Sequence, residues 1–329
     1  MSLQVYRKVF LIVSVIATNT LALAFNQPGH QIVSDIAWQE STTATRQAAL
    51  AILEHLPGKD QLLSGLPPEM DVEGQKRYLF DIASTWPDFV RSGKYQPYHR
   101  SIWHYITHPL LAAGETTTSF VPPQPLNGAA NSIEALRLNM SIVQTTTSAE
   151  DRAVALAWVM HLVGDIHQPL HNVSLFSSDY PEGDRGGNSF TVRQFQESKP
   201  LALHKVWDDI FGDHLRFSNV LELANNFHAR PEFSRAALAT DLATTEPLQW
   251  AKEGAAIARS HVYLMDTTQP LQGARWDQVS SGTATAPVLP VGYMKNSRDF
   301  MRKRAVLGGY RLATVLDHIL DPNRYPKVN

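Results

Sequence analysis

The segment from Ala149 to His167 constrains the fold most, because both of its ends carry helix signals. Ser148, followed three residues later by Asp151, resembles a capping box, a pattern that opens a helix. Pro169 ends the segment, since proline lacks the amide hydrogen that a helix interior needs. The sequence therefore predicts a strong helix over residues 149–167.

Helical patterns also cover much of the remaining chain. Apolar residues recur at helical spacing, or helix start signals occur, over 43–56, 72–84, 132–143, 201–211, 247–263 and 291–320. Strand-like alternation is sparse, and long polar or Pro/Gly-rich connections are expected at 109–130, 173–200 and 266–290. Because there is no internal repeat and no low-complexity linker, we expect an all-α fold with one compact domain over 25–329.

Composition excludes several classes of function. Hydrophobic residues make up 43% of the 329 residues and charged residues 18%, which excludes a disordered chain. The formal net charge of −2 provides no overall positive field, so nucleic acid would have to be held by local chemistry. The absence of cysteine excludes disulfides, thiol nucleophiles and cysteine-based zinc sites.

Residues 1–24 have the three parts of a secretory signal peptide. A basic pair at 7–8 precedes an apolar run over 9–17, and alanines at −3 and −1 define a cleavage site after Ala24. An uncleaved anchor is the alternative, but the run is shorter than the roughly 20 residues of a membrane helix. We expect a secreted or periplasmic protein that begins at Phe25 and has no membrane span once mature.

Histidine and aspartate spacings indicate metal chemistry. His161 and Asp165 lie four residues apart on the predicted helix, so both side chains point to one face. His204 and Asp208 repeat this spacing, and imidazole and carboxylate together suit zinc. One such pair is a weak signal, and a buried, hydrogen-bonded histidine remains the alternative for any single member. The candidate set also contains His171, Asp88 and His104.

Six motifs stand in order along the chain, and together they resemble a known family. They are Phe25-Asn26-Gln27-Pro28-Gly29-His30, Ser84-Thr85-Trp86-Pro87-Asp88, Trp103-His104-Tyr105-Ile106, the segment from His161 to His171, Asp184-Arg185-Gly186-Gly187-Asn188, and His204-Lys205-Val206-Trp207-Asp208. The family is the zinc-dependent type I nucleases, secreted single-strand-specific enzymes of fungi and plants, within the phospholipase C/nuclease superfamily.

The resemblance implies three Zn2+ ions in a cleft, held by nine residues. Asp88, His104, His161 and Asp165 would hold the first ion, and His171, His204 and Asp208 the second. Phe25, through its free amine and carbonyl oxygen, would hold the third with His30 and Asp165. Because a backbone nitrogen ligates zinc well only as a free amine, this site requires cleavage after Ala24.

The resemblance also implies a mechanism without a protein nucleophile. Zinc lowers the pKa of a bound water to about 7, and the resulting hydroxide attacks phosphorus. Asp88, Arg91 and Asn188 form the expected catalytic set, in which Arg91 and Asn188 neutralise and orient the phosphate. The alternatives are a solvated surface arginine for Arg91 and a turn residue after the two glycines for Asn188.

Three positions bear on the substrate. Tyr105 stands where the nuclease branch has an aromatic residue that stacks on a base, although simple packing is the alternative. Thr107 replaces an aspartate that contacts the base in that branch, which leaves base preference open. Asp208 resembles the nuclease branch, because the phospholipase branch has a glutamate at the corresponding position. The expected substrate contacts are therefore Tyr105, Thr107 and Asn188.

We therefore expect a secreted zinc-dependent phosphodiesterase that cleaves single-stranded DNA and RNA to 5′-nucleotides and also acts on 3′-nucleotides. No stable protein partner is predicted. Two alternatives stay open: a zinc phospholipase C acting on phospholipid head groups, and a non-catalytic zinc-binding protein. Asp184 is expected to shape the glycine loop or orient a ligand, and His167 to be structural.

Overall fold

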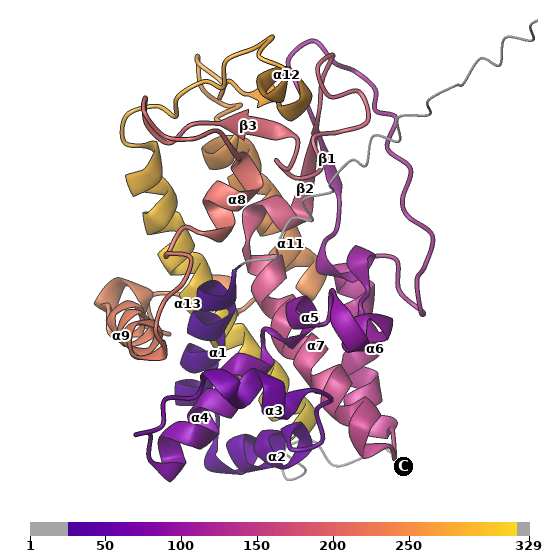
Figure 1. Ribbon diagram of the computed structural model, residues 1–329, viewed down its shortest axis with the longest axis vertical. Coiled ribbons are helices and arrows are strands. Elements are labelled where there is room, and N and C mark those ends of the chain that lie inside the picture. The colour runs from indigo at the N-terminus through magenta and orange to yellow at the C-terminus, as the bar shows by residue number, and fades with distance from the viewer. Residues whose placement is uncertain (1–25, 321–329) are drawn as a thin grey trace, which may run out of the picture.

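The structure is a computed structural model that describes residues 26–320; the predicted signal peptide and Phe25 lie outside the described residues. Most of the described chain is helical (Figure 1). The α-helices are α1 (Gln27–Glu40), α2 (Thr43–Leu53), α3 (Lys59–Leu62), α4 (Val72–Ala83), α5 (Trp86–Phe89), α6 (Ser132–Thr145), α7 (Ala149–His167), α8 (Leu203–Asp208), α9 (Phe217–His228), α10 (Ala239–Leu242), α11 (Pro247–Ile257), α12 (Trp276–Ser280) and α13 (Tyr293–Leu320). Short helical turns are η1 (Leu63–Gly65), η2 (Gly93–Tyr98), η3 (Ser101–His104), η4 (Pro169–Asn172), η5 (Pro231–Phe233) and η6 (Ala258–Val262).

Helix α7 has the bounds that the sequence predicts. The Ser148 side chain accepts a hydrogen bond from the Asp151 amide, which caps the first turn. From Ala155 to His167 every residue is buried, so this helix forms the centre of the core and not an amphipathic face. Its buried position is what allows His161 and Asp165 to lie away from bulk water.

Besides the short helices α3, α5, α10 and α12, two longer helices were not predicted from the sequence, for identifiable reasons. Helix α1 is buried on all sides between residues 28 and 38, so it has no polar stripe that would reveal a helical period. Helix α9 is amphipathic, but the preceding Arg216 provides no side-chain cap, so the usual start signal is missing.

Two predicted helices differ in part from the observed elements. The predicted helix over 201–211 begins as a short strand, because Leu201 pairs with Val192 before α8 starts at Leu203. The predicted helix over 247–263 remains α-helical to Ile257 and then widens into the π-helical turn η6.

The three connections predicted as loops contain small sheets instead of being wholly irregular. The strands are β1 (His108–Leu111), β2 (Val173–Phe176), β3 (Phe190–Val192), β4 (Leu201–Ala202) and β5 (Ala274–Arg275). Strands β1 and β2 pair in parallel, while β3 lies between β4 and β5 and is antiparallel to both. In Figure 1 these strands and α12 lie at one end of the molecule, beyond the helical bundle.

The hydrophobic core joins the ends of the described chain. Helix α1 packs along α13 and also contacts α7, so the first and last helices share one layer. Trp86, Trp103 and Trp207, which belong to three of the motifs, are buried. Among the described helices, none has both the length and the apolar character required to span a bilayer.

Candidate metal centre

Eight of the nine predicted ligands converge, and the ninth, Phe25, lies outside the described residues. They come from six different elements: His30 on α1, Asp88 on α5, His104 on η3, His161 and Asp165 on α7, His171 on η4, and His204 and Asp208 on α8. They form three groups whose donor atoms lie within 4.8 Å of one another: His30–His161–Asp165, Asp88–His104–His161 and His171–His204–Asp208.

Asp165 connects the groups. One carboxylate oxygen, Oδ2, lies 3.1 Å from His161 Nε2 and 3.2 Å from His104 Nδ1. The other, Oδ1, lies 3.4 Å from His30 Nε2 and 3.6 Å from His171 Nδ1. A fully buried carboxylate with imidazole on both sides is suited to bridge two cations.

Gly164 makes room for His30 beside this carboxylate. A Cβ atom added at Gly164 would lie 2.6 Å from His30 Nδ1, closer than such atoms approach in real structures. The His30 ring therefore lies directly on the backbone of α7 and stacks on His161, with ring centroids 3.9 Å apart. A larger residue at position 164 would push His30 away from Asp165.

Backbone carbonyls fix which nitrogen of each ring is available. The Nδ1 atoms of His161, His171 and His204 lie 2.7–2.8 Å from the carbonyl oxygens of Ser84, His104 and Gly186. A carbonyl can only accept, so these nitrogens donate, and each neutral ring presents a lone pair on Nε2. This arrangement is typical of metal-ligating histidines, whose outer partners set the tautomer.

The donor atoms fit a metal ion better than a direct hydrogen bond. The Nε2 atoms of His171 and His204 lie 3.2 Å apart, and Asp208 oxygens lie 3.7 and 3.3 Å from them. Four ligands at the usual zinc distance of about 2.0–2.1 Å lie about 3.3 Å from one another in a tetrahedron. Two lone pairs that face each other beside a carboxylate require a positive charge between them, which is either a metal ion or, in the metal-free protein, a proton on His171.

Burial and neighbouring charges strongly shift the pKa values of these ligand side chains. Burial lowers the pKa of His171, but the Asp165 and Asp208 carboxylates outweigh it and raise that pKa to about 9. Burial, together with the Arg91 charge, lowers the pKa of His104 to about 3. Burial raises the pKa of Asp165, yet His161 and His171 outweigh it and hold that pKa well below its usual value.

Asp184 organises the glycine loop that orients His204. Its buried carboxylate accepts hydrogen bonds from the Tyr263 hydroxyl, at 2.5 Å, and from the Leu175 amide, at 2.9 Å. The loop that follows brings the Gly186 carbonyl to His204 Nδ1, as described above. Gly186 has a φ of 62°, and a Cβ there would lie 2.4 Å from the Leu170 carbonyl oxygen, so the loop requires glycine.

Gln168 has a role that the sequence analysis did not assign. Its amide nitrogen donates to Asp208 Oδ1 at 2.7 Å, and its oxygen accepts from the Leu170 amide. Gln168 is fully buried. In the sequence it stands between the ligands Asp165 and His171, and this position is the signal that could have identified it. His167, by contrast, faces away from the centre and contacts Val163 and Arg311, as a structural residue would.

The predicted catalytic and substrate residues surround the cluster. Arg91 forms an ion pair with Asp88 at 2.6 Å, and Asn188 donates to the Arg185 carbonyl at 2.7 Å. The side chain of Tyr105 is 39% exposed, and Thr107 is half-buried. Arg91 thus contacts a ligand, Asn188 lines the pocket with His204 and Asp208, and Tyr105 directly follows His104 and is the most accessible of the predicted substrate contacts.

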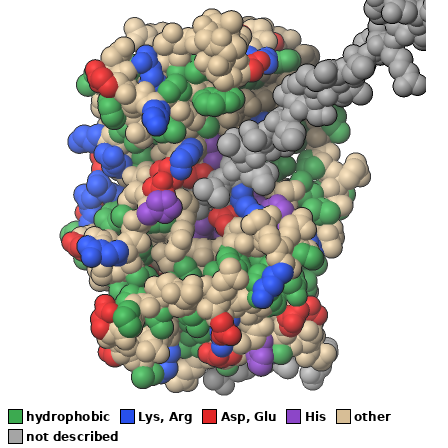
Figure 2. All heavy atoms as spheres, in the orientation of Figure 1, with side chains coloured by type: hydrophobic (Ala, Val, Ile, Leu, Met, Phe, Trp, Pro, Cys, Tyr) green, Lys and Arg blue, Asp and Glu red, His purple; other side chains and the backbone are tan. Residues whose placement is uncertain are grey.

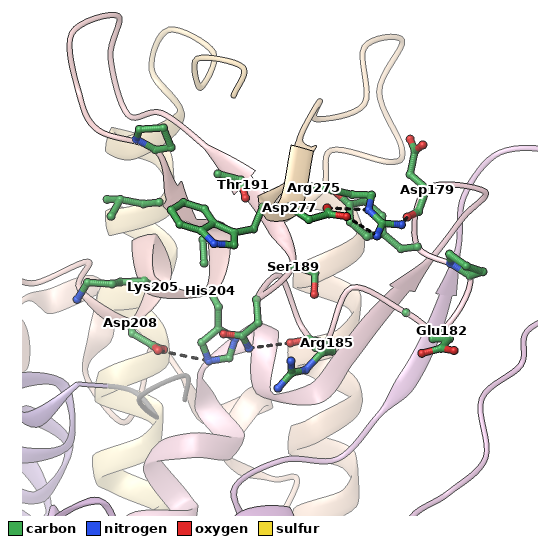
Figure 3. A pocket seen from close by; sticks show the side chains of 18 of the residues that line it. Asp179, Glu182, Arg185, Ser189, Thr191, His204, Lys205, Asp208, Arg275 and Asp277 are labelled. Atoms are coloured by element: carbon green, nitrogen blue, oxygen red, sulfur yellow. Dashed lines mark hydrogen bonds and ion pairs between the residues drawn. The ribbon is translucent and has the colours of Figure 1, made fainter. Parts of the chain in front are cut away.

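A pocket of about 1080 Å³ opens beside the second ligand group. His204, Asp208, Asn188 and Arg185 contribute to its lining, and Figure 3 shows His204 and Asp208 at its base. In Figure 2 histidine side chains and carboxylates occur together in a recess across the middle of this face. Buried donor atoms thus adjoin a space large enough for a nucleotide-sized ligand.

Fold and site together define a mostly α-helical protein with three buried His/Asp groups that could hold metal ions. The chain belongs to the S1/P1 nuclease family, whose model matches residues 25–321. It is 26% identical to endonuclease 2 of Arabidopsis thaliana over 305 residues, which covers 90% of each chain. It is also 27% identical to nuclease S1 of Aspergillus oryzae over 210 residues, or 59% of this chain and 58% of that protein.

Proposed function

We propose that the protein is a zinc-dependent phosphodiesterase that cleaves single-stranded DNA and RNA to 5′-nucleotides and removes phosphate from 3′-nucleotides. The observation that carries the proposal is the convergence of eight His/Asp side chains into three neighbouring groups, one of which, with His204 and Asp208, borders the pocket. The names of its relatives, endonuclease 2 and nuclease S1, agree with cleavage of nucleic acid.

The donor set fits three Zn2+ ions, which is the cofactor we propose. Asp88, His104, His161 and Asp165 would hold one, His171, His204 and Asp208 another, and His30 with Asp165 would contribute to the third. Bound zinc supplies an activated water near neutral pH and a positive charge for the phosphate oxygens. Phe25 would complete the third site through its amine, if the chain is exported and cleaved after Ala24.

The surrounding residues have complementary roles in this proposal. Arg91 is held by Asp88, so its guanidinium has a fixed position from which it can pair with a phosphate oxygen. Asn188 lies on the pocket wall, where its amide can orient the same phosphate. Tyr105 offers an exposed ring for an unpaired base, and a duplex, whose base faces are covered, cannot use it.

The test is an assay of the protein purified with Phe25 as its first residue. Single-stranded DNA, duplex DNA, RNA, a 3′-nucleotide and phosphatidylcholine are each incubated with the zinc-loaded enzyme and with the chelated enzyme. His204→Ala removes a proposed ligand, and His214→Ala is the matched control, because the His214 side chain is 95% exposed and lies outside the cluster. We expect chelator-sensitive release of 5′-nucleotides that H204A abolishes and H214A retains.

Other outcomes would change the assignment. Release of the phospholipid head group alone would place the protein in the phospholipase branch. Turnover that survives both the chelator and H204A would show that the His/Asp groups are not the active site. A separate variant with one residue added before Phe25 tests the third ion, and full activity of that variant would contradict ligation by the amine.

A further inference from the structure

Trp276 differs from every other tryptophan in the described structure. Its side chain is 56% exposed, whereas the other tryptophans are at most 5% exposed. It lines the pocket that also contains His204 and Asp208. An exposed indole in a pocket beside a candidate active site offers a flat apolar face to a ligand.

The three-stranded sheet fixes the position of Trp276 relative to the ligands. Thr191 in β3 pairs with Ala202 of β4 on one side and with Ala274 of β5 on the other. Ala202 and Ala274 lie on strands that run in the same direction and are two strand spacings, about 10 Å, apart. His204 and Trp276 each stand two residues beyond this row, in the first turns of α8 and α12.

An ion pair next to Trp276 holds this edge of the pocket. Arg275 binds Asp277 through two nitrogens, at 3.0 and 2.8 Å, so the residues on both sides of Trp276 are tied together. Figure 3 shows Arg275 and Asp277 across the pocket from Lys205 and Asp208. The indole therefore projects from a braced segment of backbone.

The charges of the pocket favour a neutral ligand group at this position. Arg275 is paired with Asp277, and Lys205 is paired with Asp209 at 2.6 Å. Because these cations are already neutralised, attraction of a phosphate backbone is weak here, and the exposed aromatic face is the main binding feature. A planar, uncharged nucleobase matches that feature, since every base has a face that can stack.

Arg185 provides a positive charge elsewhere in the same pocket. It lines the pocket with Trp276 and His204, is exposed, and forms no ion pair within residues 26–320. Its guanidinium can therefore hold a phosphate of a strand whose base stacks on Trp276.

We propose that Trp276 forms a second nucleobase-stacking subsite, which holds an unpaired base of single-stranded nucleic acid adjacent to the phosphate at the metal centre. The proposal rests on the function proposed above and adds a preference for substrates longer than one nucleotide. A mononucleotide has one base and cannot occupy both Tyr105 and Trp276. An oligonucleotide can occupy both, so the sheet edge would act as a selector of substrate length.

The experiment compares Trp276→Ala and Trp276→Phe with the wild-type enzyme on a single-stranded thymidine octanucleotide and on thymidine 3′-monophosphate. Phe195→Ala is the matched control, because Phe195 is 58% exposed, follows β3, and does not line the pocket. We expect W276A to lower the ratio of the two kcat/KM values, octanucleotide over mononucleotide, by about 5- to 140-fold. W276F should restore most of the ratio, and F195A should leave it unchanged.

A binding measurement separates this proposal from the function on which it rests. The zinc-loaded enzyme is titrated against a fluorescent octanucleotide whose phosphorothioate linkages resist cleavage, and anisotropy reports the Kd. Weaker binding by W276A, with W276F and F195A close to wild type, supports the subsite even if no substrate is cleaved. An unchanged Kd and an unchanged kcat/KM ratio in W276A would overturn it, whereas absence of cleavage by the wild type would overturn only the nuclease assignment.

Discussion

The Nε2 atoms of His171 and His204 lie 3.2 Å apart, and each ring donates its Nδ1 hydrogen to a backbone carbonyl. Both rings are buried, so neither lone pair can turn to water without the loss of a backbone hydrogen bond. The folded protein thus fixes an arrangement that requires a positive charge between the rings, which a bound metal ion or a proton on His171 can supply.

Metal removal should therefore destabilise the fold as well as abolish activity. An ion at 1,000 times its Kd stabilises the folded state by about 4 kcal/mol, provided that it does not bind the unfolded chain. We expect a lower Tm after chelation, measured by differential scanning fluorimetry, with recovery when Zn2+ is restored. Asp208→Asn should show a smaller shift; an equal shift in that variant would argue against this site.

Gly186→Ala should disrupt the centre without changing any ligand. The φ of 62° costs a non-glycine residue about 1–2 kcal/mol, and the clash with the Leu170 carbonyl about 1–3 kcal/mol more. Urea unfolding should show the loss, and the purified variant should contain less zinc. Gly282→Ala is the control, with a φ of 75° and no atom within 4 Å of the added Cβ, so only the backbone cost applies.

Tyr263→Phe should destabilise the protein through Asp184. It removes the hydroxyl that donates to the buried carboxylate at 2.5 Å, which is expected to cost about 1–3 kcal/mol. Tyr180→Phe is the matched comparison, because the Tyr180 hydroxyl is buried and has no hydrogen-bond partner among the described residues. Y180F should leave the free energy of unfolding unchanged or raise it; equal losses in the two variants would contradict the role of Asp184.

Asp81 should make stability fall as pH rises. Burial, and then the neighbouring Asp35 carboxylate, raise the pKa of Asp81 well above its ordinary value, so the folded state keeps a proton that the unfolded chain releases. Unfolding is then favoured with rising pH, by up to about 1.4 kcal/mol per pH unit, between the ordinary carboxyl pKa and the folded one.

The substitution Asp81→Asn tests this pH dependence. D81N should exceed the wild type in Tm at pH 8, and the difference should vanish towards pH 4. Glu73→Gln changes a 68% exposed carboxylate on the same helix and should show no such trend. A constant difference between D81N and wild type across this pH range would mean that Asp81 stays charged in the folded protein.

The sequence predicted the helices that have clear ends and the residues whose type is distinctive. Helix α7 was placed to the residue because Ser148 and Pro169 mark its limits, whereas α1 was missed because burial on all sides erases its period. The histidines and aspartates of the centre could be selected by type and spacing. Their outer partners, such as the Ser84 and Gly186 carbonyls, belong to the backbone and leave no trace in residue identity.

Trp276 shows a different limit of sequence reasoning. Nothing in its neighbouring sequence distinguishes it from the buried tryptophans, and its place in one pocket with His204 depends on the pairing of β3 with both β4 and β5. Short strands of two or three residues carry too little alternation to be recognised in advance. The relation between Trp276 and His204 is therefore a property of the sheet register, which only the structure reveals.

Because α1 packs along α13, the core around α1 cannot form until α13 has been synthesised. A Cβ at Gly309 would lie 2.4 Å from Ile36, so these helices meet backbone against side chain. At about 5–20 residues per second, the ribosome needs roughly 14–55 s to extend the chain from Ile36 to Gly309. Throughout that interval the helix that bears His30 lacks α13, the element with which it packs most extensively. Substitutions in α13 should consequently reduce the yield of finished protein through aggregation of stalled intermediates, even though they lie far from any ligand.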